Sequence, residues 1–525
     1  MRERLTFASR PSAFGLVTIM AGLMLTACMA PQQLPDLPAE PVLPNQTENT
    51  PPQPIDPVPV GSVKIGLLLP LSGPASALGV DMLSAAQMAM FDLPPHDFVL
   101  LPRDTGGDAN QARAAAQSVI DQGAEIILGP LLSSSTQAVR EVVKAHAARG
   151  NAQIQQISPT IAPAETATVP QKQNEEATDN SVSALIERAF SAIDAKENED
   201  QLAEIEPGAG DEIQTAQAAA GNRITATSSE PIKVISFSSN AKVAGDGVYI
   251  LGFRPEEQVE RVVTYAVRQG HPRIAFLGPD DAYGTVTLSG YRAGRVAAAS
   301  SGSERYALYP PAATDQSDAV RRVSDFATRA AEVDQQRALL EQRDDAAAVQ
   351  ALKALENIDT QTPPPFDAVV IADGGNRLQS VGALLAFFDV TPPDVRMLGT
   401  MRWLDDLTAL DEPNLDNSWI AAVDQEKRAA FDGLFERRLG KRPNLLAQLA
   451  YDSVALAVAI GQEDRRYPVE LLTDAEGFAG SGGIFRIRPD GLTEHGLAIL
   501  EVGRGGIKAQ REPAPSSFNT SLAGR

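Results

Sequence analysis

Short apolar runs alternate with amphipathic stretches along most of this chain, from residue 62 to about residue 400. Such runs, ending at Gly, Pro or polar clusters, are typical of buried strands. The runs that we interpret as strands are 63–69, 98–101, 125–128, 232–237, 273–277, 305–309, 368–371 and 396–399. Because the intervening stretches have helical character, the pattern predicts βαβ units and parallel sheets. The pattern runs through two successive units, which predicts an α/β protein of two Rossmann-like lobes with a cleft between them.

The stretches between these runs predict the helices. We expect them at about 79–93, 108–122, 134–149, 255–269, 283–299, 315–358, 377–388 and 426–462. Asp108 stands where an N-cap is expected, since a short acidic side chain can accept hydrogen bonds from the first free amides of a helix. The stretch 315–358 is expected to form one long charged helix that ends before Pro363.

Three segments depart from the alternation. Residues 151–230 are rich in Ala, Gln, Glu, Thr and Asn, which predicts a disordered insertion with a single helix near 182–193. Near the C-terminus the glycine-rich turn 480–483 leads into the alternating strand 484–487, and 496–502 is expected to pair with that strand as a hairpin. Residues 506–525 are expected to form a disordered tail.

Composition narrows the classes of function. The net charge of -22 and the isoelectric point near 4.7 argue against nucleic acid as a partner, because phosphate binding needs a basic surface. Aromatic residues make up only 5% of the chain, so the core is expected to be mainly aliphatic. The single cysteine leaves no disulfide, and the four histidines are too far apart in sequence to suggest a metal site. We therefore expect no metal and no cofactor.

The N-terminus has the pattern of a secretory signal. Arginines precede the apolar run 14–25, which is too short to span a bilayer and is followed by Leu25-Thr26-Ala27-Cys28. With cysteine at the first mature position, this signal resembles a bacterial lipobox, in which the cysteine is lipidated and the leader is removed. We therefore expect a signal peptide at 1–27 and an acyl anchor on Cys28. The alternative is a buried cysteine that happens to follow a leader.

The next segment, 28–61, is expected to act as a tether. Its many prolines favour an extended polyproline II conformation that reaches roughly 100 Å. Such a tether would hold the folded part of the protein away from the membrane. Sequence leaves open whether its length is functional or whether it is a passive spacer.

Ligands of open α/β sheets bind beyond the carboxyl ends of the strands. Polar and aromatic side chains at these ends are the candidate site residues. They are Ser72, Ser133, Ser134, Ser135, Ser238, Ser239, Asn240, Tyr283, Arg402 and Trp403. Ser133 or Ser134 could bind an anion at a helix N-terminus, but we favour the interpretation that one of them caps the helix. Trp403 could be a core residue instead.

Catalytic motifs are missing from the sequence. It contains no nucleophile elbow, P-loop or metalloprotease motif, and the glycine-rich segment 480–483 precedes a strand, as a turn does. Acid pairs such as Asp405 and Asp406 are common on an acidic surface. The sequence therefore favours a non-enzymatic binding protein.

In order and spacing, these residues resemble the type I periplasmic binding proteins of the Leu/Ile/Val-binding family over about 62–149 and 231–505. The resemblance rests on the segments 65–73, 129–136, 234–236 and 281–284. In that family the serine stretch and the residues after the next strand hold an amino acid's carboxylate and ammonium, and the tyrosine lines the cleft. The resemblance implies these roles for Ser133, Ser134, Ser135, Ser238, Ser239, Asn240 and Tyr283.

The same resemblance divides the chain into lobes. It implies a first lobe of 62–252 with 425–470, carrying the insertion, and a second lobe of 253–424 with 471–505. The family's amino acid binders place an acid after the last strand of the second lobe, where this chain has the cation Arg402. Since a buried ammonium without a partner is costly, this departure argues against a free α-amino acid as ligand.

The lipobox, the tether, the insertion and the long helix together resemble the lipoproteins called penicillin-binding protein activators. This resemblance implies a periplasmic, outer-membrane-anchored protein that binds and activates a peptidoglycan synthase, and Met29 after Cys28 fits outer-membrane sorting. The alternative is the substrate-binding component of an ABC-type transport or sensing system for a branched-chain amino acid or an amide. The expected partners are the membrane, a penicillin-binding protein and a small amino acid-like ligand.

Overall fold

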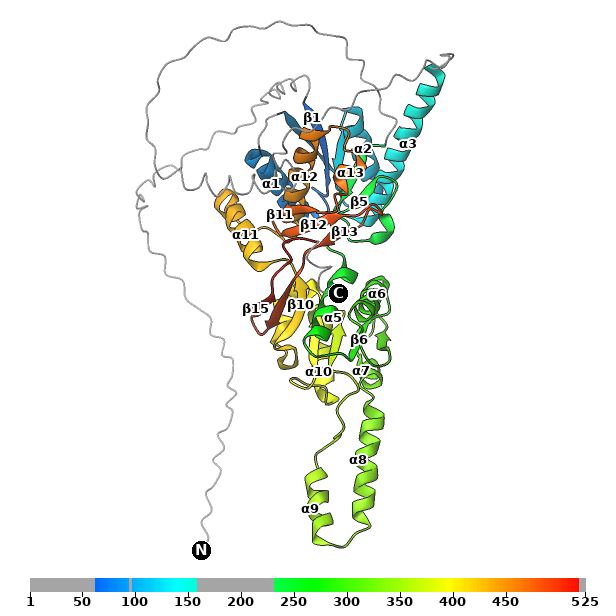
Figure 1. Cartoon of the computed structure of the whole chain (residues 1–525), viewed down its shortest axis with the longest axis vertical. Coiled ribbons are helices and arrows are strands. Elements are labelled where there is room, and N and C mark those ends of the chain that lie inside the picture. The colour runs from blue at the N-terminus through cyan, green and yellow to red at the C-terminus, as the bar shows by residue number, and fades with distance from the viewer. Residues whose placement is uncertain (1–61, 94–96, 158–230, 519–525) are drawn as a thin grey trace, which may run out of the picture. The chain divides into compact units, whose positions relative to one another are not determined.

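The computed structural model of the chain describes residues 62–93, 97–157 and 231–518 (Figure 1). The expected signal peptide, the Cys28 anchor, the tether and most of the 151–230 insertion lie outside these residues. The descriptions below concern the compact unit that spans Val58–Arg525. Within the described residues no helix combines the length and the apolar character needed to cross a membrane.

The first lobe is built on a parallel sheet of order β2-β1-β3-β4-β5. Its strands are β1 (Val63–Leu69), β2 (Phe98–Asp104), β3 (Ile126–Leu128), β4 (Lys233–Ser236) and β5 (Val248–Ile250). Leu67 faces a core formed with α1 (Ser76–Asp92) and α12 (Ala447–Glu463), and Leu68 faces a second cluster formed with α2 (Ala109–Asp121) and α3 (Ser133–Ile157). The β1 side chains therefore bury both faces of the sheet, as its continuous apolar run predicts.

The expected capping residue of α2 is confirmed. Asp108 has extended backbone angles, and its Oδ1 accepts hydrogen bonds from the amides of Asn110 and Gln111 at 2.8 and 3.0 Å. Two of the free N–H groups of the first helical turn are thereby satisfied.

The second lobe contains a sheet of order β15-β14-β10-β9-β8-β6-β7. The strands are β6 (Ile274–Pro279), β7 (Arg305–Tyr309), β8 (Ala368–Ile371), β9 (Arg396–Gly399), β10 (Ser418–Ala422), β14 (Ala498–Gly503) and β15 (Gly506–Glu512). The strands β6 to β10 are parallel, and β14 and β15 add two antiparallel strands at one edge. One face packs on α5 (Pro255–Arg268) and α6 (Ala282–Ala297), and the other on α7 (Ser317–Val323) and α10 (Gly375–Phe387). The fold class expected from the sequence is thus present in both lobes.

Residues 425–463 form two helices, α11 (Gln425–Leu439) and α12, whose buried side chains join the core of the first lobe. The stretch 426–462 is mainly helical, as expected, and it is divided because Gly440 has a left-handed backbone (φ 70°) and α12 begins only at Ala447.

The assignment of 471–495 to the second lobe is wrong. This segment forms α13 (Val469–Leu472) at its start and then a small sheet of β11 (Phe478–Gly480), β12 (Gly483–Ile487) and β13 (Thr493–His495). The Phe478 and Phe485 rings lie 5.6 Å apart and pack in the same core as β1 and α12. The expected hairpin of 484–487 with 496–502 is also wrong, since β12 pairs with β11 and β13, and β14 pairs with β10 and β15.

Three further expectations are corrected. Residues 506–512 are not a disordered tail, because they form β15 on β14. Residues 151–157, expected to begin the disordered insertion, continue α3. The single helix expected over 315–358 is three helices, α7, α8 (Phe326–Glu341) and α9 (Ala346–Leu355).

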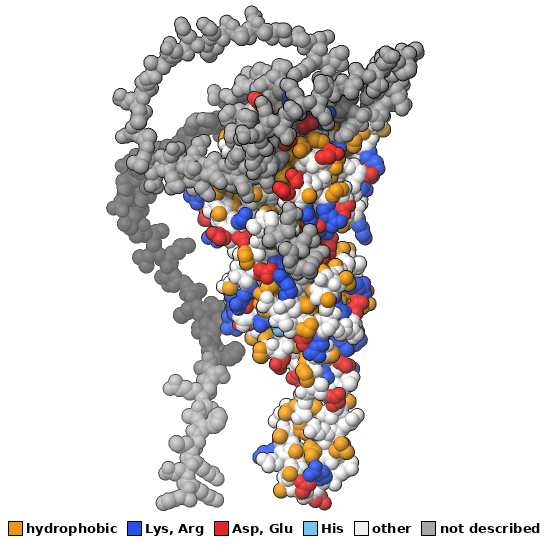
Figure 2. All heavy atoms as spheres, in the orientation of Figure 1, with side chains coloured by type: hydrophobic (Ala, Val, Ile, Leu, Met, Phe, Trp, Pro, Cys, Tyr) orange, Lys and Arg blue, Asp and Glu red, His pale blue; other side chains and the backbone are white. Residues whose placement is uncertain are grey.

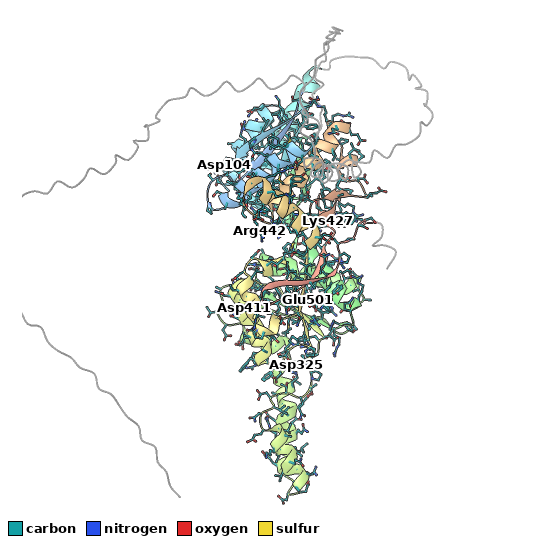
Figure 3. All side chains as sticks on the ribbon, turned by 90° about the vertical axis from the view of Figure 1, so that its left-hand side faces the viewer. Asp104, Asp325, Asp411, Lys427, Arg442 and Glu501 are labelled. Carbon is teal, nitrogen blue, oxygen red and sulfur yellow. The ribbon has the colours of Figure 1, made fainter. Side chains whose placement is uncertain are left out.

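The break between α7 and α8 lies at Asp325, whose φ of 55° cannot continue a helix, and Figure 3 shows this residue where the α8–α9 hairpin leaves the lobe. The turn before α9 is fixed by Asp345, whose carboxylate caps that helix through the amide of Ala348. Figure 1 shows α8 and α9 projecting from the second lobe on the side away from the first lobe.

The chain crosses between the lobes at 251–254, 423–424 and 495–497, and residues 513–518 lead from β15 back to the small sheet of the first lobe, where the Arg486 guanidinium lies over the Phe518 ring. The first three crossings enclose a small cavity of about 20 Å³, which is lined by residues from each of them and by Gln448 and Asp452 of α12. The crossings lie side by side, so they define a hinge region beneath the cleft between the lobes.

Candidate ligand-binding cleft

A cavity of about 520 Å³ lies between the two lobes, beyond the carboxyl ends of their parallel strands. It is lined by Leu78, Leu131, Leu132, Ser133, Phe237, Ser238, Ser239, Gly252, Phe253, Pro255, Gln258, Tyr283, Thr400, Met401, Arg402, Asp405, Leu445 and Leu446. Its volume is within the range of small-molecule sites. Of the expected site residues, Ser133, Ser238, Ser239, Tyr283 and Arg402 are brought together here.

In the first lobe, hydroxyl groups join the ends of β3 and β4. Ser133 Oγ lies 3.0 Å from Ser238 Oγ, and Thr136 Oγ1 lies 2.8 Å from Ser236 Oγ beneath them. The hydrogen bond of the Ser133 hydroxyl is thus made across to the next strand end, rather than as the helix cap that the sequence favoured. Ser135 is fully buried, and its Oγ has no hydrogen-bond partner among the described residues.

The other expected residues of the first lobe do not line the cavity. Ser134 is exposed on α3, and Asn240 accepts a hydrogen bond from the amide of Lys242 at the start of a short 3-10 turn. Ser72 donates its amide to Asp104 Oδ1 at 3.2 Å. Burial tends to raise the pKa of the Asp104 carboxyl. Hydrogen bonds from Ser72, Gly106 and Leu71 outweigh this effect and hold the pKa below its usual value. Asp104 is labelled in Figure 3.

In the second lobe, Tyr283 and Arg402 form a stacked pair. Tyr283 lies in the first turn of α6, which Asp281 caps by accepting a hydrogen bond from Gly284 N at 2.9 Å. The Tyr283 hydroxyl lies 2.8 Å from Thr400 Oγ1, and the Arg402 Cζ lies 4.7 Å from the centre of the tyrosine ring. Burial raises the pKa of Tyr283, so the phenol is neutral and can hydrogen-bond.

Trp403 is a core residue and does not line the cavity. It follows Arg402 in the 3-10 turn η2 (Met401–Leu404), but its ring is fully buried and its Nε1 donates to the Ile371 carbonyl at 3.1 Å. The interpretation of Trp403 as a core residue, which the sequence left open, is the correct one.

Sequence reasoning missed several residues of the cleft. Asp405, three positions after Arg402, lines the same cavity, and burial raises the pKa of its carboxyl although the charge of Arg402 opposes this. Gln258 of α5 accepts a hydrogen bond from Met401 N at 2.9 Å and holds the start of η2. The spacing of Asp405 from Arg402, three residues on one turn, could have indicated that Asp405 lies in the cleft. The leucines of the cavity could not be identified from the sequence, because they look like ordinary core positions.

The hinge cavity holds a second set of buried polar groups. Asp452 Oδ1 accepts the amide of Ser481 at 2.8 Å, and burial raises the pKa of Asp452 to about 6. His495 contacts Glu257 through its backbone N (2.5 Å) and Nδ1 (3.4 Å), and its Nε2 has no partner among the described residues. At about 20 Å³ this cavity is too small for an organic ligand.

Nothing in the described part of the chain suggests a metal centre. Across residues 62–93, 97–157 and 231–518, no three His, Cys, Asp or Glu side chains are grouped closely enough to hold a metal ion. Acidic and basic side chains are interspersed on the face shown in Figure 2, with no region of a single sign.

Two lobes with parallel sheets, joined by several crossings and separated by a cleft at the strand ends, are the architecture of the two-lobed binding-protein fold. The model of the family described as periplasmic binding protein matches residues 62–191 and 194–507, so the chain belongs to this family. The expected type I periplasmic binding protein fold is thereby confirmed.

The chain is similar to several solved structures. A putative branched-chain amino acid ABC transporter protein from Rhodospirillum rubrum is 15% identical with a TM-score of 0.53, and the match covers 85% of this chain and 99% of that one. A leucine binding protein from Thermotoga maritima is 14% identical (TM-score 0.47; 86% and 99% covered). A solute binding protein from Rhodopseudomonas palustris with 3,4-dihydroxybenzoic acid is 12% identical (TM-score 0.47; 87% and 99% covered). At these identities the similarity concerns the fold alone, and no curated protein matches the chain significantly in sequence.

Proposed function

We propose that this protein binds a small organic molecule in the cleft between its lobes and acts as a non-enzymatic binding protein. The observation that carries the proposal is the Arg402–Tyr283 pair on the cavity wall. Among the described residues Arg402 forms no ion pair, and its guanidinium is held over the tyrosine ring with its donors available. A held cation next to hydroxyl and apolar groups is what a specific ligand site requires.

A ligand in this cleft would contact both lobes. The serines and the first-lobe leucines lie on one wall, and Tyr283 and Arg402 lie on the other. Because chain crossings at the hinge join the lobes, a molecule that contacts both walls stabilises their closed arrangement. Capture of a solute for an ABC-type transport or sensing system fits this mechanism, and the description of the Rhodospirillum rubrum protein supports it.

The experiment is a thermal unfolding screen of the full-length protein in detergent. The panel contains the L-amino acids, their amides and aromatic carboxylates. A ligand present at 100 times its Kd should stabilise the protein by about 2.7 kcal/mol and raise the Tm. The Arg402→Gln variant should lose the response, and the Arg343→Gln variant, altered on the exposed α8–α9 hairpin, should keep it. A flat response to the whole panel would contradict the proposal.

A second candidate function is activation of a peptidoglycan synthase by a lipoprotein anchored through Cys28 to the outer membrane. The α8–α9 hairpin supports it. The hairpin is added between β7 and β8, contributes nothing to the cleft, and exposes Leu339 by 65% and Val349 by 61%. Exposed apolar side chains on a projecting element are common at protein interfaces.

The test of this second function has two parts. Affinity purification from solubilised membranes should recover a penicillin-binding protein with the wild type but not with the Leu339→Glu, Val349→Glu double variant. The matched control is Gln335→Glu, Gln350→Glu, which adds the same charge at exposed polar positions of the same helices. The Cys28→Ala variant should leave the membrane fraction. Recovery of transporter permeases alone would favour the transport role.

A further inference from the structure

The hinge cavity beneath the cleft combines room for solvent with buried polar side chains. Its volume of about 20 Å³ accommodates one water molecule, since a buried water needs about 10–15 Å³ and two to four polar partners. Three polar side chains line the cavity, those of Gln448, Asp452 and His495. Gln448 and Asp452 belong to α12 of the first lobe, whereas His495 ends β13 and begins a crossing to the second lobe. A rotation of one lobe against the other therefore changes the walls of this cavity.

His495 joins the two lobes. Its backbone N donates to the carboxylate of Glu257 in α5 at 2.5 Å, and its Nδ1 lies 3.4 Å from the same carboxylate. Arg254 of the first crossing adds a second link, because its Nε donates to the Thr493 carbonyl at 3.2 Å. The side chain of His495 is only 8% exposed, and its Nε2 has no partner among the described residues. Buried nitrogens of this kind are normally satisfied, and water in the cavity can satisfy this one.

Asp452 lines the same cavity from the first lobe. Its Oδ1 accepts the amide of Ser481 at 2.8 Å, and within the described part of the chain it forms no ion pair. Burial raises the pKa of Asp452 to about 6, although hydrogen bonds from Ser481 and the charge of His495 act in the opposite direction. In mildly acidic solution the carboxyl is therefore neutral. At higher pH it becomes a buried carboxylate, which water stabilises.

Charged groups on the elements around this pair have partners of their own. Asp424, in the second crossing, caps α11 and accepts a hydrogen bond from Gln510 Nε2 at 2.9 Å. Burial tends to raise the pKa of Asp424, but hydrogen bonds from Lys427 and Gln510 outweigh this effect and keep the group ionised. The other pairs near the hinge are Tyr451–Asp92, Arg438–Asp92, Lys441–Asp81, Arg428–Asp432, Arg486–Glu494 and Arg254–Glu256. Asp452 and His495 are left as a pair whose charges depend on each other.

We propose that the hinge cavity is a site for water and a proton. One water molecule bridges the Asp452 carboxyl and His495 Nε2, and release of the Asp452 proton to solvent shifts the lobes toward an arrangement in which the cavity holds more water. An arrangement that solvates Asp452 better lowers the cost of its charge, so loss of the proton favours that arrangement. Each unit of difference in the pKa of Asp452 between the two arrangements changes their ratio tenfold. This response needs no ligand in the cleft.

The test measures the distance between the lobes in solution by fluorescence resonance energy transfer. The dyes are attached through Ala114→Cys on α2 and Ser289→Cys on α6, two exposed positions, in the full-length chain with Cys28→Ala. Between pH 5 and pH 7.5 the ratio of the two arrangements should change ~10-fold, with a midpoint near pH 6. Asp452→Asn should remove this change and keep the distance that the wild type has in acid. Asp464→Asn, whose carboxyl titrates at about 2, should respond as the wild type does.

Two further measurements separate the water from the proton. Sucrose is excluded from protein surfaces and disfavours a more hydrated arrangement, so it should move the midpoint to higher pH. His495→Gln removes the charge that favours the Asp452 carboxylate, so it should also move the midpoint to higher pH. Circular dichroism checks that each variant is folded.

Each other result overturns a defined part. A wild-type distance that stays constant from pH 5 to pH 7.5 refutes the coupling between the hinge and the proton. A change that persists in Asp452→Asn refutes the role of Asp452, and a midpoint that His495→Gln leaves unchanged refutes the link to His495. A midpoint that sucrose does not move refutes the uptake of water. None of these results bears on ligand binding in the cleft, which the thermal unfolding screen tests separately.

Discussion

The guanidinium carbon of Arg402 lies 4.7 Å from the centre of the Tyr283 ring, although 118 residues separate the two in sequence. Tyr283 starts α6 directly after β6, and Arg402 follows β9, so the parallel sheet brings them to one edge. Thr400 fixes the tyrosine hydroxyl at 2.8 Å. The ring beneath Arg402 therefore sets the position of this cation on the cleft wall.

Tyr283→Phe and Tyr283→Leu separate these two contacts. The phenylalanine variant loses only the hydrogen bond to Thr400, so the free energy of unfolding should fall by about 1 kcal/mol. The leucine variant also loses the ring under Arg402, and we expect a further loss of ~0.5–1 kcal/mol. Urea unfolding measures both. Equal losses in the two variants would show that the ring contributes nothing to holding Arg402.

Asp452 should make stability depend on pH in an unusual direction. Burial raises its pKa in the folded state to about 6, from an ordinary value of 3.8. Between these values the folded state keeps a proton that the unfolded state has released, so the free energy of unfolding falls as pH rises from 4 to 6 and then levels off. Asp452→Asn lacks this proton equilibrium and can still accept the Ser481 amide.

The measurement is the difference in unfolding free energy between wild type and Asp452→Asn from pH 4 to pH 7. The wild type should lose ~1–3 kcal/mol relative to the variant over this range. Asp464→Asn is the control. Hydrogen bonds from Arg466 lower the pKa of Asp464 to about 2, so its titration lies below this window. A difference that is constant with pH would contradict the assignment.

Arg329 anchors the α8–α9 hairpin from inside. Its side chain is buried at 4% exposure and donates to the carbonyls of Thr362, Phe388 and Asp389 at 2.8–3.1 Å. Lysine cannot reproduce this planar set of donors, so Arg329→Lys should cost ~2–4 kcal/mol. Arg343→Lys, at the exposed hairpin turn, should change stability by less than ~0.5 kcal/mol.

Hydrogen exchange gives the local readout for this prediction. The amides of α8 should lose protection in Arg329→Lys while those of β1 keep it, because the hairpin is held to the lobe mainly at its base. Uniform loss across both lobes would mean that Arg329 stabilises the whole protein rather than this anchor.

Gly399 provides room for Trp403. A Cβ at Gly399 would lie 2.2 Å from Trp403 Cε2, so Gly399→Ala should destabilise by ~3 kcal/mol through forced displacement of the buried ring. Gly433 in α11 meets only the end of Arg437 at 3.3 Å, and Gly433→Ala should stabilise by ~0.5–1 kcal/mol through helix propensity. Thermal unfolding with tryptophan fluorescence compares the pair. A destabilising effect at both glycines would point to backbone conformation instead of space.

Local pattern was enough for three strands of the second lobe but gave no prediction for β10. The expected bounds of β7, β8 and β9 coincide with those of the structure, because short apolar runs with polar or proline ends determine where a buried strand starts and stops. Local pattern failed to predict the lobe to which residues 471–495 belong, where Phe478 and Phe485 pack in the core of the first lobe. This position depends on packing against α12, a contact between distant parts of the sequence that the local pattern of residues does not indicate.

The candidate site shows the same division. The rule that ligands bind at strand ends located Ser133, Ser238, Tyr283 and Arg402. This rule could not predict that Arg402 lines the cleft and Trp403 does not. Both residues lie on one turn of 3-10 helix, which places Arg402 in the cleft and Trp403 in the core. The first-lobe leucines were missed because an apolar residue on a concave surface looks in sequence like any core position.

The order of elements along the chain constrains when each lobe can form. The core around β1 includes side chains of α12 and β12, and the second sheet needs β14 for its antiparallel edge. Both contributions follow the rest of the chain in sequence. Neither lobe can therefore complete its core before the chain has been synthesised as far as β14. Until that point both lobes lack part of their core, and their apolar side chains stay accessible to chaperones.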